Sequence, residues 1–134
     1  MKPCIALIAL LVRDYDEAIA WYRDALGLQL LDDRDLGAGK RWVRMAPDGN
    51  TDFSLLLAEA AGPAQLACVG NQHGGRVGFF LHTDDFARDH ARMATAGVAF
   101  EEVPRHEDYG TVAVFRDLYG NRWDLIEPRA EHSA

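Results

Sequence analysis

The sequence predicts an α+β fold in which a βαβββ module is used twice. Short apolar runs of strand length outnumber the amphipathic helical patterns, which favours a mixed, sheet-rich architecture. A helical pattern that begins at an aspartate and ends at a glycine thirteen positions later occurs twice, at 14–27 and at 84–97. The turn sequence DGN at 48–50 returns 71 positions later as YGN at 119–121. A repeat of this length indicates two related halves.

The first module is expected at about residues 4–58. Cys4–Val12 is a continuous apolar run of strand length, suited to a sheet that is covered on both faces. Asp14 is the expected N-cap of the following helix, with Glu17 at the capping-box position, and Gly27 is the expected stop. The remaining strands are expected at 28–32, 41–46 and 52–58, with polar, glycine-containing turns at 33–39 and 47–50.

A linker at about 59–75 leads into the second module, which is expected at about 76–128. The linker is rich in Ala, Gly, Pro and Gln, and we expect it to hold at most a short helix. In the second module either Asp84 or Asp85 caps the helix, and Gly97 ends it. Strands are expected at 77–83, 98–103, 111–116 and 122–127, with a polar crossover at 104–108.

The last two strands form a predicted hairpin around the turn 117–121. Gly120 can take the positive φ that such a turn requires, and Asn121 tolerates it. Strand alternation then puts Asp124 on one face with Arg122 and Ile126, and puts Trp123, Leu125 and Glu127 on the other. An aspartate in mid-strand is either a solvated surface group or a polar group in a pocket. The orientation of Asp124 therefore decides much of the functional interpretation.

Composition narrows the class of protein. A chain of 134 residues has the size of one domain, and its 49% apolar and 26% charged residues are typical of a soluble globule rather than a disordered chain. The net charge of −7 disfavours nucleic acid or an anionic membrane as a partner and favours cationic or neutral ligands. The two cysteines lie in apolar surroundings, so we expect buried free thiols. The N-terminal apolar run is too short to cross a bilayer and lacks a cleavage site, which favours a cytoplasmic protein.

Three segments resemble the vicinal oxygen chelate superfamily, the group of glyoxalase I, the extradiol dioxygenases and the fosfomycin and bleomycin resistance proteins. They are LLVRDYDEAIAWYRDALGL at 10–28, HTDDFARDHARMATAGVAF at 82–100 and FRDLYGNRWDLIE at 115–127. The resemblance implies one domain over 1–134 whose two βαβββ modules form a curled, cup-shaped mixed sheet with the helices outside. It also implies a small-molecule pocket and a homodimer.

Metal-dependent members of this superfamily hold their ion with four residues, and the resemblance assigns a position to each. The first histidine falls on Leu7, and the carboxylate falls on Ser54, with Leu56 as the alternative register. The second histidine falls on Gly78 or Val77, and the last carboxylate falls on Asp124. Divalent transition metals require several His, Cys, Asp or Glu ligands. We therefore expect no cofactor, although a divalent metal with another ligand set is left open.

Asp124 and His82 are the candidate catalytic residues, because His82 shares the strand face of Gly78 and histidine is a common proton donor and acceptor in enzymes. The candidate ligand pocket comprises Leu7, Trp42, Ser54, Gly78, Phe80 and Tyr109.

Three functions remain as alternatives. The first is a metal-independent binding protein of the bleomycin-resistance kind, which would sequester a small molecule without turnover. The second is a metal-dependent lyase, isomerase or dioxygenase-like enzyme with an unusual ligand set around Asp124. The third is a metal-free enzyme that uses Asp124 and His82 as acid and base. The sequence names neither the ligand nor the reaction.

Overall fold

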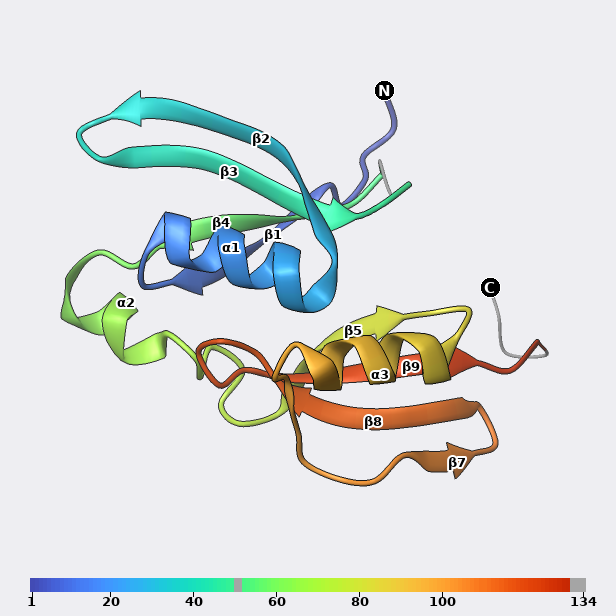
Figure 1. The fold of residues 1–134 in the computed structure, drawn as a ribbon. Coiled ribbons are helices and arrows are strands. Elements are labelled where there is room, and N and C mark those ends of the chain that lie inside the picture. The colour runs from blue at the N-terminus through green and yellow to red at the C-terminus, as the bar shows by residue number, and fades with distance from the viewer. Residues whose placement is uncertain (50–51, 131–134) are drawn as a thin grey trace. The chain divides into compact units, whose positions relative to one another are not determined.

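The computed structural model describes residues 1–49 and 52–130, which form two compact units. The first unit is Met1–Val69 and the second is Gly70–Ala134. Each contains one mixed sheet with a helix on one of its faces (Figure 1). The predicted α+β class is confirmed. No helix in the described ranges is long and apolar enough to cross a membrane.

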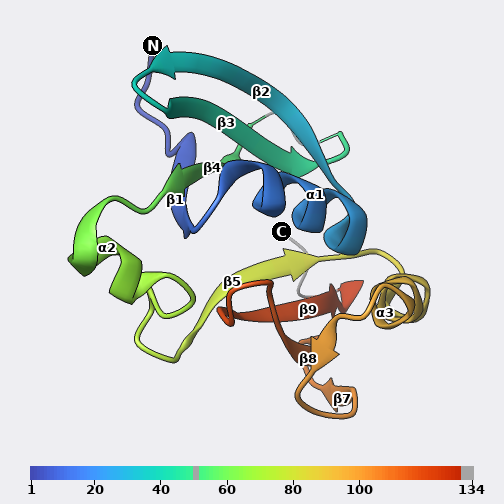
Figure 2. The same ribbon diagram turned by 60° about the vertical axis from the view of Figure 1, so that its left-hand side comes forward.

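The first unit has the element order βαβββ, followed by a short helix. Its strands pair in the order β1-β4-β3-β2, with β1 parallel to β4 and the other pairs antiparallel. The helix α1 lies along one face of this sheet (Figure 2). The elements are β1 (Leu7–Val12), α1 (Tyr15–Leu26), β2 (Leu28–Gly37), β3 (Lys40–Pro47), β4 (Ser54–Glu59) and α2 (Gly62–Cys68).

Local sequence signals set the ends of α1. The Asp14 side chain accepts a hydrogen bond of 2.8 Å from the backbone N–H of Glu17, so the predicted N-cap is confirmed. Gly27 takes the left-handed conformation and donates its N–H to the carbonyl of Arg23, which ends the helix as predicted. The apolar side of α1 packs on the sheet, and its buried members are Tyr15, Ala18, Ile19, Tyr22, Ala25 and Leu26.

The second unit repeats the same strand order. Its sheet has the order β5-β9-β8-β6, with β7 also pairing with β8, so the first strand again lies parallel to the last. This match confirms the βαβββ repeat that the sequence predicted. The elements are β5 (Val77–His82), α3 (Phe86–Thr95), β6 (Ala99–Phe100), β7 (Arg105–Glu107), β8 (Gly110–Arg116) and β9 (Arg122–Pro128).

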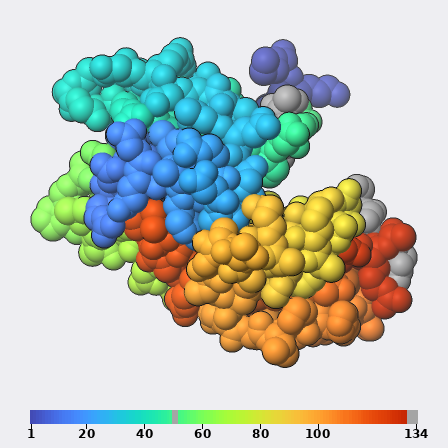
Figure 3. Space-filling model, in the orientation of Figure 1, coloured from blue at the N-terminus to red at the C-terminus, as the bar shows by residue number. Residues whose placement is uncertain are grey.

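Aromatic rings fill the space between α3 and the second sheet. Trp123 stacks on Phe79 at 4.6 Å between ring centroids and on Phe115 at 5.7 Å. Phe100 continues the cluster and meets His90 of α3 at 4.1 Å. His90 therefore packs against this aromatic cluster while it remains half-buried. The outer surface of α3 forms much of the visible surface of the second unit (Figure 3).

Three predictions about local structure are wrong. The polar stretch expected as a turn at 33–39 is mostly strand, because β2 continues to Gly37 and its acidic residues pair with β3, as Asp33 does with Arg41. The strand expected at 98–103 shortens to Ala99–Phe100, and part of the expected crossover forms β7. Both cysteines, Cys4 and Cys68, are free but exposed rather than buried.

Candidate functional site

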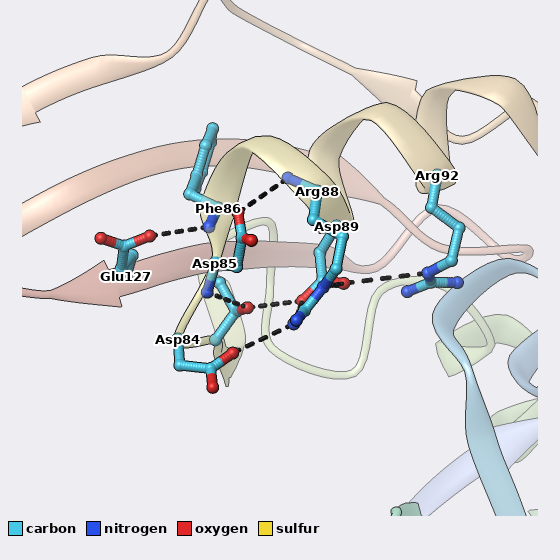
Figure 4. A network of polar contacts seen from close by, with 8 residues as sticks. Asp84, Asp85, Phe86, Arg88, Asp89, Arg92 and Glu127 are labelled. Atoms are coloured by element: carbon cyan, nitrogen blue, oxygen red, sulfur yellow. Dashed lines mark hydrogen bonds and ion pairs between the residues drawn. The ribbon is translucent and has the colours of Figure 1, made fainter.

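The helix-free face of the second sheet holds Asp124, and we call this surface the open face of the second unit. Glu127, on the same strand, points the other way: its Oε1 accepts a hydrogen bond of 2.7 Å from the backbone N–H of Phe86 at the start of α3 (Figure 4). Because side chains alternate along a strand, Asp124 lies on the side away from α3. The register adds five neighbours to the open face, namely Phe80, His82, Val112, Val114 and Ile126.

Asp124 is a partly buried carboxylate without full hydrogen bonding. Its Oδ1 is buried and accepts no hydrogen bond from any residue that the structure describes. Burial raises the pKa of Asp124, and the charge of Glu102 raises it further, whereas Arg105 and Arg122 lower it. The loss of water is the largest of these effects. A buried acceptor without a donor costs free energy, so the folded chain tolerates this group rather than gaining stability from it.

The arginines around Asp124 have carboxylate partners of their own. Arg105 pairs with Glu102 and with Glu107, each at 2.9 Å. Arg122 pairs with Glu101 at 3.0 Å. These arginines therefore form their ion pairs with other carboxylates, and Asp124 forms no ion pair within the part of the chain that the structure describes, although the charges of Arg105 and Arg122 still lower its pKa.

Phe80 and His82 lie beside Asp124 on the neighbouring strand. Phe80 is the direct register partner of Asp124, and His82 is the partner of Ile126, two residues further along. Phe80 has 60% of its surface exposed, although it occupies mid-strand. His82 is also exposed. The structure thus brings three of the predicted site residues onto one face, in adjacent rungs.

Gly78 and Tyr109 lie away from the rung that Phe80 and Asp124 form. A Cβ built at Gly78 would lie 2.2 Å from Nδ1 of His73, so the imidazole of His73 occupies the place of a side chain there. The β-bulge between Val77 and Phe79 interrupts the regular alternation at this point. Tyr109 precedes β8 and lies five residues from Val114, about 17 Å along the strand at ~3.3 Å per residue. Its side chain interacts with Arg105.

The first unit carries the other predicted pocket residues on its own helix-free face. Leu7 and Ser54 are register partners on β1 and β4. Arg44 lies across from Leu56 and donates hydrogen bonds to Asp32 at 2.6 Å and to Ser54 at 3.3 Å. Trp42 is two residues before Arg44 and is half-buried. This face therefore presents a guanidinium that is paired with one acid.

The residues at the expected metal-ligand positions do not fit a divalent ion. Leu7 and Gly78 supply no ligand atom, and the hydroxyl of Ser54 accepts from a cation, Arg44. The strand register matches Asp124 to Leu56 of the first unit rather than to Ser54, and leucine offers no ligand either. Within residues 1–49 and 52–130, no three His, Cys, Asp or Glu side chains cluster as a metal site would require.

Sequence reasoning gave no site role to three residues that shape these faces: Asp32, Glu102 and Arg105. Glu102 accepts hydrogen bonds from the backbone N–H of Val114 at 3.2 Å and from Arg105. It therefore bonds to β8 in the gap between the part of β8 that pairs with β6 and the part that pairs with β7. Its Glu-Glu-Val-Pro-Arg context gave the only signal, a charged stretch before a proline. A depression of about 380 Å³ at the β2–β3 hairpin, lined by Asp33, Asp35 and Arg41 among others, lies in the first unit and contains none of the candidate residues.

The comparison with protein families shows to which superfamily the chain belongs. The chain matches the Glyoxalase/Bleomycin resistance protein/Dioxygenase superfamily over residues 5–125. It belongs to this superfamily, as the sequence resemblance indicated. An uncharacterized protein of Shewanella frigidimarina (strain NCIMB 400) is 52% identical to it over 128 residues, which is 95% of each chain.

Solved structures agree with this assignment. The crystal structure of UcmS2 has a TM-score of 0.81 at 27% identity and covers 95% of this chain and 99% of that chain. The crystal structure of TnmS3, an antibiotic binding protein from Streptomyces sp. CB03234, has a TM-score of 0.76 at 32% identity and covers 96% and 98%. These likenesses confirm the fold, and one of the two relatives is a binding protein by name.

Proposed function

We propose that the protein is a metal-independent small-molecule binding protein whose ligand contacts the open face of the second unit around Asp124. The observation that carries this proposal is the donor set. Of the four positions at which the superfamily resemblance implies metal ligands, only Asp124 keeps an ionisable group. Similarity to TnmS3, an antibiotic binding protein, supports a binding role without turnover.

The chemistry of the open face suits a bound organic molecule. Phe80 offers an exposed aromatic side chain, and Asp124 supplies one polar group beside it, next to the buried side chains of Val114 and Ile126. Small-molecule sites commonly combine such apolar walls with a few polar groups that orient the ligand. Asp124, whose buried oxygen lacks a hydrogen-bond donor among the described residues, is the polar group that orients the ligand.

Metal analysis together with a thermal-shift screen tests the proposal. We expect protein purified without chelator to hold less than stoichiometric Ni, Zn, Fe or Mn. We also expect at least one small molecule to raise the melting temperature, equally with and without EDTA. A ligand at 100 times its Kd stabilises the folded state by about 2.7 kcal/mol, a shift of several degrees. Stoichiometric metal that is lost in Asp124→Ala, with stabilisation that requires it, would overturn the proposal.

A second candidate is a metal-free acid–base enzyme. Asp124 and His82 share one face in adjacent rungs, and burial raises the pKa of Asp124 toward the range where a carboxyl group can donate a proton. If the bound molecule is a substrate, His82→Gln and Asp124→Asn should abolish its conversion, as measured by mass spectrometry, while His82→Gln still binds it. Recovery of the ligand unchanged after prolonged incubation with wild-type protein contradicts turnover.

We also propose that the two modules serve one vicinal-oxygen-chelate domain and that the protein acts as a cytoplasmic homodimer. Both statements rest on the superfamily resemblance. Sedimentation at micromolar concentration measures the oligomeric state directly, and a monomer would contradict the dimer.

A further inference from the structure

We propose that the ligand carries a protonated nitrogen next to a flat apolar group, with Asp124 as its counter-ion and Phe80 as its apolar wall. This inference rests on the proposed binding function and names the chemical class that the same site takes. Three observations carry it: the charge balance of the open face, the buried oxygen of Asp124, and the position of Phe80.

The ion pairs among the described residues leave Asp124 as the carboxylate of this group without a partner. Arg105 lies between Glu102 and Glu107, and both Arg122 and Arg116 reach Glu101. Three guanidinium groups thus pair with three carboxylates. The fourth carboxylate, Asp124, receives no donor at Oδ1 from the described residues. An added positive charge at this point completes the pairing, and an added negative charge meets an uncompensated anion.

The buried oxygen favours a charged donor over a neutral one. A neutral hydroxyl would satisfy the hydrogen bond of Oδ1 but leave the carboxylate charge in a partly dehydrated place. A protonated nitrogen supplies the opposite charge, and it also supplies the hydrogen bond once the Asp124 side chain turns its buried oxygen toward the ligand. Opposite charges also attract each other more strongly in a partly dehydrated place than in bulk water, because the effective dielectric constant is lower there. Binding a cation therefore recovers more of the free energy that burial of Asp124 costs.

Phe80 places an apolar surface within reach of the same ligand. It is the register partner of Asp124 on the adjacent strand, and neighbouring strands lie about 4.8 Å apart. Its ring is 60% exposed, so a flat group can lie against it while an attached ammonium reaches the carboxylate. The ring face itself attracts cations, which reinforces the preference.

Other charged groups near Asp124 act in both directions. Arg105 and Arg122 form ion pairs with other carboxylates but still lower the pKa of Asp124, and His82 is an exposed neighbour on the same face. Glu102, whose charge raises the pKa of Asp124, makes the local potential more negative.

The experiment compares three dyes that share one flat ring system and differ in charge. They are 9-aminoacridine (cationic at pH 7.5), acridine (neutral) and acridine-9-carboxylate (anionic). Binding to the full-length protein is measured by isothermal titration calorimetry and by dye fluorescence anisotropy. The variants are Asp124→Asn, which keeps the shape and removes the charge, and Phe80→Ala. The matched control is Asp84→Asn, which also removes one negative charge from the second unit. The side chain of Asp84 is 90% exposed, and the residue is far from Asp124 in the sequence.

We expect wild-type protein and Asp84→Asn to bind the cationic dye at least about tenfold more tightly than the neutral one. Asp124→Asn should abolish that preference and still show a cooperative melting transition. Phe80→Ala should bind both the cationic and the neutral dye more weakly. Equal affinity of wild-type protein and Asp124→Asn for the cationic dye overturns the inference. If the thermal-shift screen has meanwhile found neutral ligands that bind without metal, the binding function survives and only the cationic class fails.

Discussion

Replacing Asp117 tests whether the turn before β9 holds the site strand in place. Asp117 is 6% exposed and accepts hydrogen bonds from three backbone N–H groups of the turn, from the amide of Asn121 at 3.0 Å and from the indole of Trp123 at 3.0 Å. In Asp117→Ala these donors lose their acceptor. Water can reach the outer part of the turn, but Asn121 and Trp123 are buried.

The magnitude follows from the buried donors. The backbone and side-chain N–H groups of Asn121 and the indole N–H of Trp123 each cost about 1–3 kcal/mol when left unpaired, and such costs are less than additive. We therefore expect Asp117→Ala to lose about 3–5 kcal/mol, which is a large part of a typical stability of ~5–15 kcal/mol. For a chain of this length that lowers the melting temperature by about 10 °C or more.

Urea unfolding followed by tryptophan fluorescence measures the loss, with Asp108→Ala as the control because Asp108 is an exposed acid of the same unit. Asp117→Asn should fall between the two. Its amide retains one acceptor oxygen but turns a donor toward groups that are themselves donors. A loss below about 1 kcal/mol in Asp117→Ala would refute the reasoning, because the network would then hold the turn no better than water does.

Three further predictions concern the site and its supports. Asp124→Asn should raise the melting temperature at pH 7.5, because the folded pKa of Asp124 is raised above its unfolded value and ionisation therefore opposes folding. In scanning calorimetry this gain over wild type should shrink as the pH falls through the folded pKa toward about 4. Gly78→Ala should destabilise by about 1–3 kcal/mol in urea, because the new methyl group collides with His73, and His73→Ala in the same chain should restore part of the loss. Glu127→Ala should cost about 1–2 kcal/mol through the lost hydrogen bond to Phe86 but leave ligand affinity unchanged, since Glu127 faces α3; a tenfold loss of affinity would contradict that orientation.

Much of the fold follows from short-range signals. Asp14 and Gly27 bracket α1 because a cap and a left-handed glycine act within one turn of chain. Which residues of β9 share a face with Asp124 follows from alternation, which depends only on the strand itself. These features were predictable from the sequence for that reason. The repeated βαβββ order was also predictable, because both copies carry an aspartate at the start of the helix and a glycine after its end.

Other features depend on contacts between distant segments and escaped prediction. The carboxylate of Glu102 replaces a strand hydrogen bond at Val114, twelve residues away, so the expected strand ends early. The polar residues at 33–37 form strand because β3 pairs with them, against their own turn propensity. That His73 fills the space beside Gly78 depends on how the preceding loop folds back. None of these has a signature within a few residues.

The two copies of the fold differ at one equivalent rung, and that difference supports the proposed binding without metal. Ala9 and Phe80 each lie five residues before the N-cap of their helix, and their register partners are Leu56 and Asp124. On the next strand the first unit has Arg44 where the second has Val114. The rung of the first unit thus carries a cation that is paired with Asp32, and the rung of the second unit carries an anion that has no ion-pair partner among the described residues. A divalent transition metal requires several oxygen, nitrogen or sulfur ligands, and the rung of the second unit offers only the carboxylate of Asp124. A single carboxylate beside an exposed aromatic side chain suits the proposed organic cation better than it suits a metal ion.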